Sequence, residues 1–561
     1  MRPTLLTTLI ASLLIGTPVP LRADALLLRG GRILTAADAP QGKRWADALL
    51  VVDGRVAAIG SERDVRRECG RLGLKPAERD LGGAFAMPGL IDAHGHVSGL
   101  GQSLRRLRFF GTTSAEQIAG MVAKAAAERP AGEWILGRGW DQNDWAVKQF
   151  PTRALLDSVA PGHPVWLRRV DGHAGWANSR ALALAGVTRE TRDPDGGRIE
   201  RGPAGEPTGV LVDNAMSLVQ AAVPAPTAEQ TSRDIESALR ACAQLGLTGV
   251  HDAGVGTDEL DAYRKLEGSH ALTIRVAAML SSGAVLHGSA LAARRQPGLE
   301  GMFRVFAIKA YADGALGSRG AALLEPYADD PGNRGLLVTS PDTLEILARM
   351  GLQAGLPLCV HAIGDRGNRE ALEAFERAAG GAANLRGKRF RIEHAQVVAL
   401  NDIPRFARAG VIASMQPTHC TSDMPWAPDR LGEQRLEGAY AWRHMLGAGV
   451  RLALGSDFPV EDANPLLGVY AAVTTQDLAG QPPKGYRPSE KLTLWEALRG
   501  FTSDAAYAAS MEREVGRLAV GYRADVAVFD RDLTIVPFDA IPKARCVLTM
   551  VNGQVAWDAK P

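Results

Sequence analysis

Two histidines separated by one residue follow an apolar run in the segment 88–97, PGLIDAHGHV. Pro88 and Gly89 favour a turn before the run, and the run itself is typical of a buried strand. Side chains two positions apart in a strand point the same way, so we expect His94 and His96 to face one side. Two neutral imidazoles on one side suit a metal ion. The alternative is a pair of surface histidines on a loop, and other parts of the chain must decide between the two.

Four more residues that could bind metal or transfer protons occur at or near the ends of later apolar runs. They are Lys309 in VFAIKAYADG (305–314), His361 in LCVHAIGD (358–365), His394 in FRIEHAQ (390–396) and Asp457 in RLALGSD (451–457). Each alone has a structural explanation, such as a polar cap or a lysine that reaches solvent. Six such residues at strand ends favour one shared site over six unrelated explanations.

The apolar runs alternate with helical stretches rich in Ala, Leu, Glu and Arg. The eight predicted strands are 89–94, 248–254, 275–280, 305–314, 358–365, 390–396, 411–417 and 451–457. This alternation predicts an α/β fold with a parallel (β/α)8 TIM-like barrel over residues 87–509. Active sites of such barrels lie at the carboxyl ends of the strands. Residues 98–235 are too many for one connection, so we expect an inserted subdomain after strand one.

Both ends of the chain have the short apolar runs and turns of β structure. Residues 25–36 and 48–61 contain Gly-Arg turns, and 545–557 contains an Asn552–Gly553 hairpin turn. We therefore expect one small β-sandwich domain built from residues 24–86 and 510–561.

The motifs together resemble a known family. The segments PGLIDAHGH, KAYADGALGSR, VHAIGDRGN, IEHAQ and LGSDFPVEDANPL, with GRGWDQNDW (137–145) and DGHAGWANSRAL (171–182), are similar to the metal-dependent amidohydrolase superfamily. They resemble its amidohydrolase 3 branch, which includes N-substituted formamide deformylases. The resemblance covers nearly the whole chain after residue 23 and is specific for fold and metal chemistry rather than for substrate.

The resemblance implies a site with two divalent metal ions, which we expect to be zinc. His94, His96 and Asp457 would bind one ion, and His361 and His394 the other. Lys309, carboxylated by carbon dioxide, would bridge them. Electrostatics favours a carboxylated lysine at this position, because an unmodified ammonium group between two dications would be strongly repelled. Asp457 would also be the catalytic acid–base residue, or else serve only as a ligand.

This site predicts an enzyme: a hydrolase that cleaves the carbonyl–nitrogen bond of an amide, an N-acyl amine or an N-formyl amine. One alternative is a mononuclear aminohydrolase (deaminase) on the same barrel. Family deaminases often carry a glutamate three residues after the strand-five histidine, whereas residue 364 is Gly. A second alternative is a non-catalytic periplasmic binding protein, which would be expected to lack part of the metal set.

A tryptophan-rich region gives a hypothesis for substrate binding. Five tryptophans fall within residues 134–176: Trp134, Trp140, Trp145, Trp166 and Trp176. We expect Trp140 and Trp176 to contact an apolar substrate group, and Asp171 and His173 to orient the amide. The alternative is that the tryptophans form the core of the inserted subdomain. Of the other histidines, His251 could line the pocket, whereas His163, His270, His287, His419 and His444 are expected to be structural.

Composition limits the remaining possibilities. A net charge of +2, with 46% hydrophobic and 22% charged residues, is typical of a soluble globular protein with a small-molecule substrate and gives no sign of nucleic-acid binding.

Residues 1–23 have the charged start and short apolar core of a signal peptide, which predicts export to the periplasm or medium. No later run is apolar enough to predict a membrane span. The five widely spaced cysteines suggest buried thiols, and nothing indicates an oligomeric state.

Overall fold

The computed structural model describes residues 25–109, 111–142, 145–169, 174–194, 197–213, 215–286, 301–317 and 319–559. The expected signal peptide, residues 1–23, lies outside this part of the chain, so export stays a prediction. Within the described ranges, no helix is both long enough and apolar enough to cross a membrane.

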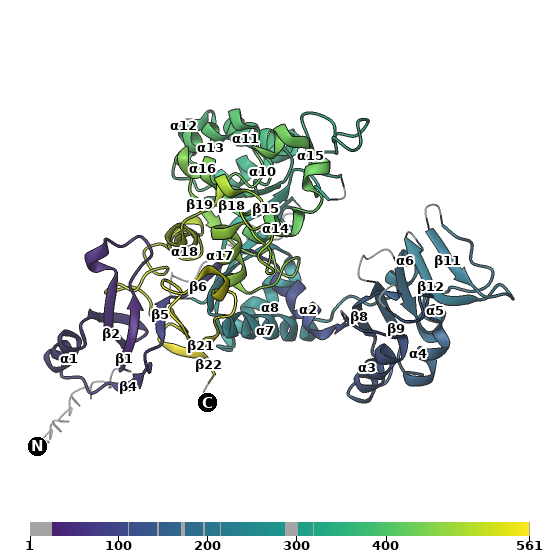
Figure 1. The fold of residues 1–561 in the computed structure, drawn as a ribbon, viewed down its shortest axis with the longest axis horizontal. Helices are drawn as coiled ribbons and strands as arrows, with labels where there is room; N and C mark the ends of the chain where they lie inside the picture. The colour runs from purple at the N-terminus through teal and green to yellow at the C-terminus, as the bar shows by residue number, and fades with distance from the viewer. Residues whose placement is uncertain are drawn as a thin grey trace, which may run out of the picture.

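Eight parallel strands form the central sheet, and each coincides with one of the eight predicted runs (Figure 1). They are β6 (Leu90–Gly95), β13 (Leu247–Val255), β14 (Arg275–Ser281), β15 (Phe303–Tyr311), β16 (Leu358–Ala362), β17 (Arg391–His394), β18 (Ile412–Met415) and β19 (Leu452–Leu454). Neighbouring strands pair in sequence order from β6 to β19. The predicted TIM-like barrel is therefore confirmed as the architecture of this region.

The barrel closes at the carboxyl ends of its first and last strands. The His96 backbone N–H donates to the Phe458 carbonyl oxygen at 2.7 Å, and the Asp457 N–H donates to the His94 carbonyl oxygen at 2.7 Å. Gly95 and Phe458 form the parallel bridge between them. The contacts that close the barrel thus belong to the same residues that were expected to bind metal.

Helices pack around the strands and connect each one to the next, except the last three, which follow β19 (Figure 1). They are α7 (Ala228–Gln244), α8 (Thr257–Gly268), α9 (Ser282–Leu286), α10 (Pro341–Ala354), α11 (Asp365–Ala379), α12 (Ala382–Leu385), α13 (Ile403–Ala409), α14 (Pro417–Asp423), α15 (Ala427–Leu436), α16 (Trp442–Gly447), α17 (Pro465–Thr474), α18 (Leu494–Gly500) and α19 (Ser503–Ala508). The ends of these helices carry the residues that commonly cap helices. For α10, the Ser340 hydroxyl accepts from the Thr343 N–H at 3.2 Å and Gly355 ends the helix at a φ of 67°.

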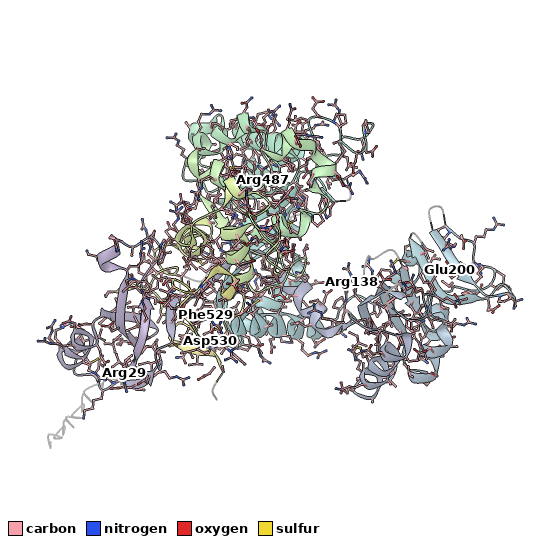
Figure 2. All side chains as sticks on the ribbon, viewed as in Figure 1. Arg29, Arg138, Glu200, Arg487, Phe529 and Asp530 are labelled. Atoms are coloured by element: carbon pink, nitrogen blue, oxygen red, sulfur yellow. The ribbon has the colours of Figure 1, made fainter. Side chains whose placement is uncertain are left out.

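An inserted subdomain leaves the barrel after strand one through α2 (Val97–Arg105). Its sheet has the order β11-β12-β10-β9-β8-β7 and lies apart from the barrel in Figure 1. In Figure 2, Arg138 lies on the side of this subdomain toward the barrel and Glu200 lies farther out. Its elements are β7 (Leu107–Arg108), α3 (Ala115–Ala127), β8 (Ile135–Trp140), α4 (Arg153–Val159), β9 (Val165–Arg169), β10 (Ala174–Ala177), α5 (Ser179–Leu184), β11 (Gly197–Arg201), β12 (Pro207–Asp213) and α6 (Met216–Gln220).

Trp140 and Trp176 form part of the hydrophobic core of this subdomain, which corrects the expectation that they contact substrate. Both side chains are fully buried, and their ring centroids lie 6.4 Å apart. Their indole N–H groups donate within the subdomain, to the Leu167 and Thr152 carbonyl oxygens. An indole whose N–H is paired and whose ring is enclosed has no surface left for a ligand.

The two ends of the chain join in one sheet, in the order β22-β21-β20-β5-β1-β2-β3, with β4 paired to β1. Its strands are β1 (Ala25–Leu34), β2 (Trp45–Val52), β3 (Arg55–Gly60), β4 (Ala77–Asp80), β5 (Phe85–Pro88), β20 (Val526–Phe529), β21 (Cys546–Val551) and β22 (Gln554–Asp558), and α1 (Glu62–Arg71) follows β3. The strands follow one continuous hydrogen-bonded order, so the finer prediction of a sandwich of two sheets is not confirmed.

A buried ion pair and a close backbone approach connect this sheet to the barrel. Arg275, the first residue of β14, contacts Asp525 with a nitrogen–oxygen distance of 2.7 Å. Gly246 packs so closely on Phe529 that a Cβ at this position would lie 2.9 Å from the ring. Phe529 and Asp530 are labelled at this junction in Figure 2.

The core position of Trp176 generates a prediction. Trp176→Ala should destabilise the inserted subdomain by about 3–5 kcal/mol, because it removes a fully buried indole and leaves a cavity. Hydrogen exchange measured by mass spectrometry should accelerate in peptides from β8 and β9. Leu184→Ala, an exposed position in the same subdomain, is the control and should leave exchange unchanged. Unchanged exchange in Trp176→Ala, together with lost substrate binding, would instead support the expectation that Trp176 contacts the substrate.

Candidate metal centre

Five side chains from five strand ends meet at the mouth of the barrel, and a sixth begins the helix after strand one. His94 lies in β6, Lys309 in β15, His361 in β16 and His394 in β17. Asp457 follows β19, and His96 is the N-cap of α2. The ring centroid of His394 lies 4.9 Å from that of His94 and 4.6 Å from that of His361. The six residues predicted to bind metal therefore come from distant parts of the chain to one place.

The carboxylate of Asp457 lies between the imidazoles. Its Oδ1 atom is 3.1 Å from His96 Nε2 and 3.6 Å from His94 Nε2, and its Oδ2 atom is 3.7 Å from His419 Nε2. Two ligand atoms that each lie 2.0–2.1 Å from a tetrahedral zinc ion are about 3.3 Å apart. The separations around Asp457 are thus close to those expected of ligands that share an ion.

Hydrogen bonds at Nδ1 determine which nitrogen of three histidines faces the site. Nδ1 of His94 contacts Glu393 at 2.6 Å, Nδ1 of His96 contacts the Ala253 carbonyl at 2.9 Å, and Nδ1 of His394 contacts Gln416 Oε1 at 2.7 Å. These partner oxygens accept, so each Nδ1 carries the proton. Each Nε2 therefore presents its lone pair, which is the form that binds a metal.

A buried arginine holds the carboxylate behind His94. The Arg391 guanidinium donates to both oxygens of Glu393 at 2.8 Å, and also to the Ala93 carbonyl and the Ser414 hydroxyl. Arg391, Glu393 and His94 have no exposed surface. His251, expected to line the pocket, instead contacts Arg391 Nη1 through its Nδ1 at 3.0 Å inside the barrel.

Burial keeps three of the imidazoles neutral, whereas for His96 burial is outweighed by the Asp457 carboxylate, which raises the pKa of His96 above its usual value. Burial lowers the pKa of His361 to about 3 and lowers those of His94 and His394 well below the usual range. Burial also lowers the pKa of the Lys309 amine. For Asp457, burial raises the pKa, but the neighbouring His96, His94 and His419 imidazoles outweigh it and bring the pKa down to about 2. The site therefore combines the neutral imidazoles of His94, His361 and His394 with an ionised carboxylate that also stabilises the proton of His96.

The residues present fit divalent metal ions. His94 Nε2, His361 Nε2 and Lys309 Nζ are buried atoms without a hydrogen-bond partner in the described chain. Buried polar atoms are normally paired, so an unpaired group of this kind needs an explanation. Two sets of ligand atoms lie within 4.8 Å of one another: His94, His96 and Asp457, and His394, His419 and Asp457. Imidazole nitrogen and carboxylate oxygen are the usual ligands of zinc.

The structure adds three residues that the sequence did not suggest for this site. His419, expected to be structural, approaches Asp457 from α14, two residues beyond the predicted strand 411–417. Arg391 and Glu393 support His94. The sequence feature that could have indicated them is the presence of two charged residues inside the apolar run FRIEHAQ. Of the predicted substrate-binding residues, Trp140 and Trp176 lie in the subdomain core, and Asp171 and His173 fall outside the described residues.

Comparisons with known proteins agree with this geometry. Residues 77–556 match the sequence model of the amidohydrolase family. The chain is 34% identical to YtcJ of Bacillus subtilis (strain 168) over 538 residues, 94% of this chain and 98% of YtcJ. It is 28% identical to an N-substituted formamide deformylase of Arthrobacter pascens over 539 residues, 91% of this chain and 95% of that protein. An uncharacterized metal-dependent hydrolase from Pyrococcus furiosus aligns with a TM-score of 0.76 and 29% identity, over 91% of this chain and 99% of that one.

The support of His94 by Glu393 can be tested by substitution. Glu393→Gln should weaken metal binding by roughly 10- to 100-fold, because it removes the charged acceptor that orients His94. Competition with a chromogenic chelator measures this affinity. The matched control is Glu490→Gln, since Glu490 is also fully buried and contacts a histidine Nδ1, that of His444, at 2.7 Å outside the site. Equal metal affinity in both variants would contradict the assigned role of Glu393.

Proposed function

The chain belongs to the amidohydrolase family of metal-dependent hydrolases, and we propose that it hydrolyses the carbonyl–nitrogen bond of N-acyl or N-formyl amines. The observation that carries the proposal is the convergence of His94, His96, His361 and His394 with Lys309 and Asp457 at the barrel mouth. A metal-assisted hydrolase needs such a set of neutral imidazoles and a carboxylate.

Two divalent ions, which we take to be zinc, would occupy this set. His94, His96 and Asp457 would hold one ion, and His361 and His394 the other. Lys309, carboxylated on Nζ, would lie between them. Support for the carboxylation comes from the position of Nζ, which is buried without a hydrogen-bond partner in the part of the chain that the structure describes. An unmodified ammonium group there would be repelled by both cations.

Bound divalent ions would supply the Lewis acidity that polarises a carbonyl and acidifies water. The chain's own residues provide the proton transfer. Asp457 is ionised above about pH 2, so at neutral pH it can accept a proton from the attacking water. The water oxygen then bonds to the carbonyl carbon, the carbon–nitrogen bond breaks, and Asp457 returns the proton to the leaving nitrogen. Glu393, Ala253 and Gln416 keep the histidines in the tautomer that the site requires.

Two features support an apolar substituent on the substrate. Tyr311 is partly exposed at the end of β15, and its ring centroid lies 5.5 Å from that of His361. Val460, three residues after Asp457, is exposed as well. The choice of N-formyl and N-acyl amines follows the name of the related formamide deformylase. Export of the enzyme, expected from residues 1–23, is part of the same proposal.

Removal of Lys309 tests the bridge. Lys309→Ala should lower metal content and reduce kcat by at least about 100-fold, in the range that metal-site residues contribute. Short carboxylates such as formate or acetate should partly restore both, because they can supply the missing oxygen ligands. Metal content is measured by elemental analysis and turnover by amine release. A Lys309→Ala enzyme with full metal content and full activity would contradict the carboxylated bridge.

The substrate class can be tested with the metal-reconstituted enzyme. We expect amine release from N-formyl and N-acyl arylalkylamines, and loss of this activity after chelation. Aminopurines and lactones in the same panel test whether the enzyme instead releases ammonia from an amine or cleaves an ester ring. Ammonia release from aminopurines without amide cleavage would favour the aminohydrolase alternative. Cleavage of lactones alone would contradict the carbon–nitrogen specificity.

A further inference from the structure

His419 approaches the metal centre from strand seven, which contributes none of the six predicted ligands. It lies in the first turn of α14, directly after β18, with Gln416 as the N-cap and Pro417 as the first helical residue. Proline at this position favours the start of a helix, since its fixed φ suits the first turn. The end of β18 thus delivers His419 to the same rim as the other histidines.

The imidazole of His419 is directed at the site. Its ring is nearly parallel to that of His394, with an interplanar angle of 23° and a centroid separation of 5.7 Å. Its Nε2 atom is buried, has no hydrogen-bond partner among the described residues, and lies 3.7 Å from Asp457 Oδ2. This distance is too long for a hydrogen bond between nitrogen and oxygen. It is close to the separation of about 3.3 Å expected for two ligand atoms on one tetrahedral ion.

The helix that carries His419 is held in place by its own contacts. Asp423, one helical turn after His419, accepts hydrogen bonds from Gln396 Nε2 at 2.7 Å and from the Tyr440 hydroxyl at 2.8 Å. Gln396 lies two residues after His394, so these bonds fix α14 against the segment that carries the neighbouring imidazole. A side chain oriented in this way is preorganised for a ligand.

We propose that His419 is a seventh metal-binding residue, which coordinates the ion held by His394. The ligand atoms of His394, His419 and Asp457 lie within 4.8 Å of one another, as those of His94, His96 and Asp457 do. Asp457 lies between the two groups, with Oδ1 toward His94 and His96 and Oδ2 toward His419. This inference rests on the proposed function only insofar as the protein binds metal, and it is independent of the substrate.

The test is the metal affinity of His419→Ala. The reconstituted full-length protein is titrated with a chromogenic chelator, and metal content is measured by elemental analysis after gel filtration. We expect the ion held by His394 to lose affinity by at least about 100-fold, since loss of residues that only support ligands costs 10- to 100-fold. Added imidazole should restore metal content by filling the space left by the side chain. In the cobalt(II)-substituted protein, the visible absorption of that ion should change as one nitrogen ligand is lost.

Two further variants make the result interpretable. His444→Ala removes a half-exposed histidine outside the site and should keep wild-type metal content. His94→Ala should lose metal whatever the role of His419. If His419→Ala does not fold by circular dichroism, His419→Gln provides the same measurement with a side chain of similar size that lacks the imidazole.

The outcomes separate the two proposals. Full affinity for both ions and an unchanged cobalt spectrum in a folded His419 variant would overturn the assignment, even if activity were lost. A wild-type protein that binds no divalent metal would overturn both proposals, whereas one that binds metal at His419 but cleaves no amide would overturn the proposed function alone. Reduced affinity that imidazole restores would support His419 as a ligand.

Discussion

The candidate metal centre depends on one buried ion pair, between the Glu393 carboxylate and the Arg391 guanidinium. Glu393 orients His94, and Arg391 holds Glu393 while also bonding to the Ala93 carbonyl and to Ser414. These contacts join β6, β17 and β18 inside the barrel. Removing one partner of such a pair leaves a buried charge uncompensated, at a cost of about 3–5 kcal/mol. The same group therefore stabilises the barrel interior and determines which nitrogen of His94, a proposed metal ligand, carries the proton.

The contacts that close the barrel also position the residues of the site. The Asp92 carboxylate accepts from the Ser456 N–H at 3.1 Å, from the Ser456 hydroxyl at 2.7 Å and from the His94 N–H at 3.0 Å. It thereby joins strand one to the residue before Asp457. With the backbone bonds of His96 and Asp457, it sets the separation between the histidine pair and the carboxylate. A site built from strand ends is rigid because the strands themselves are fixed by the sheet.

The inserted subdomain has a core of its own, which explains why Trp140 and Trp176 are unavailable to substrate. The ring of Trp140 lies beside those of Trp145 and Trp176, in one apolar cluster with residues of α3 and α4. Aromatic residues supply large buried area in a small domain, so their clustering is expected from stability alone. Tyr311, a partly exposed aromatic side chain beside His361, belongs instead to the barrel.

The sequence by itself determined the barrel strands and the residue types at their ends, because the period of apolar residues and the chemistry of His, Lys and Asp are local properties. It also indicated an insertion after strand one and β structure at both ends. Only the tertiary structure decided which side chains meet. Glu393 reaches His94 across 299 positions, and His419 reaches Asp457 from a helix whose sequence gave no metal signal. Local pattern likewise could not decide whether the tryptophans face a core or a ligand, because both surfaces are apolar. That choice depends on how α3, α4 and the sheet of the inserted subdomain pack together, and it is set by contacts between residues far apart in the chain.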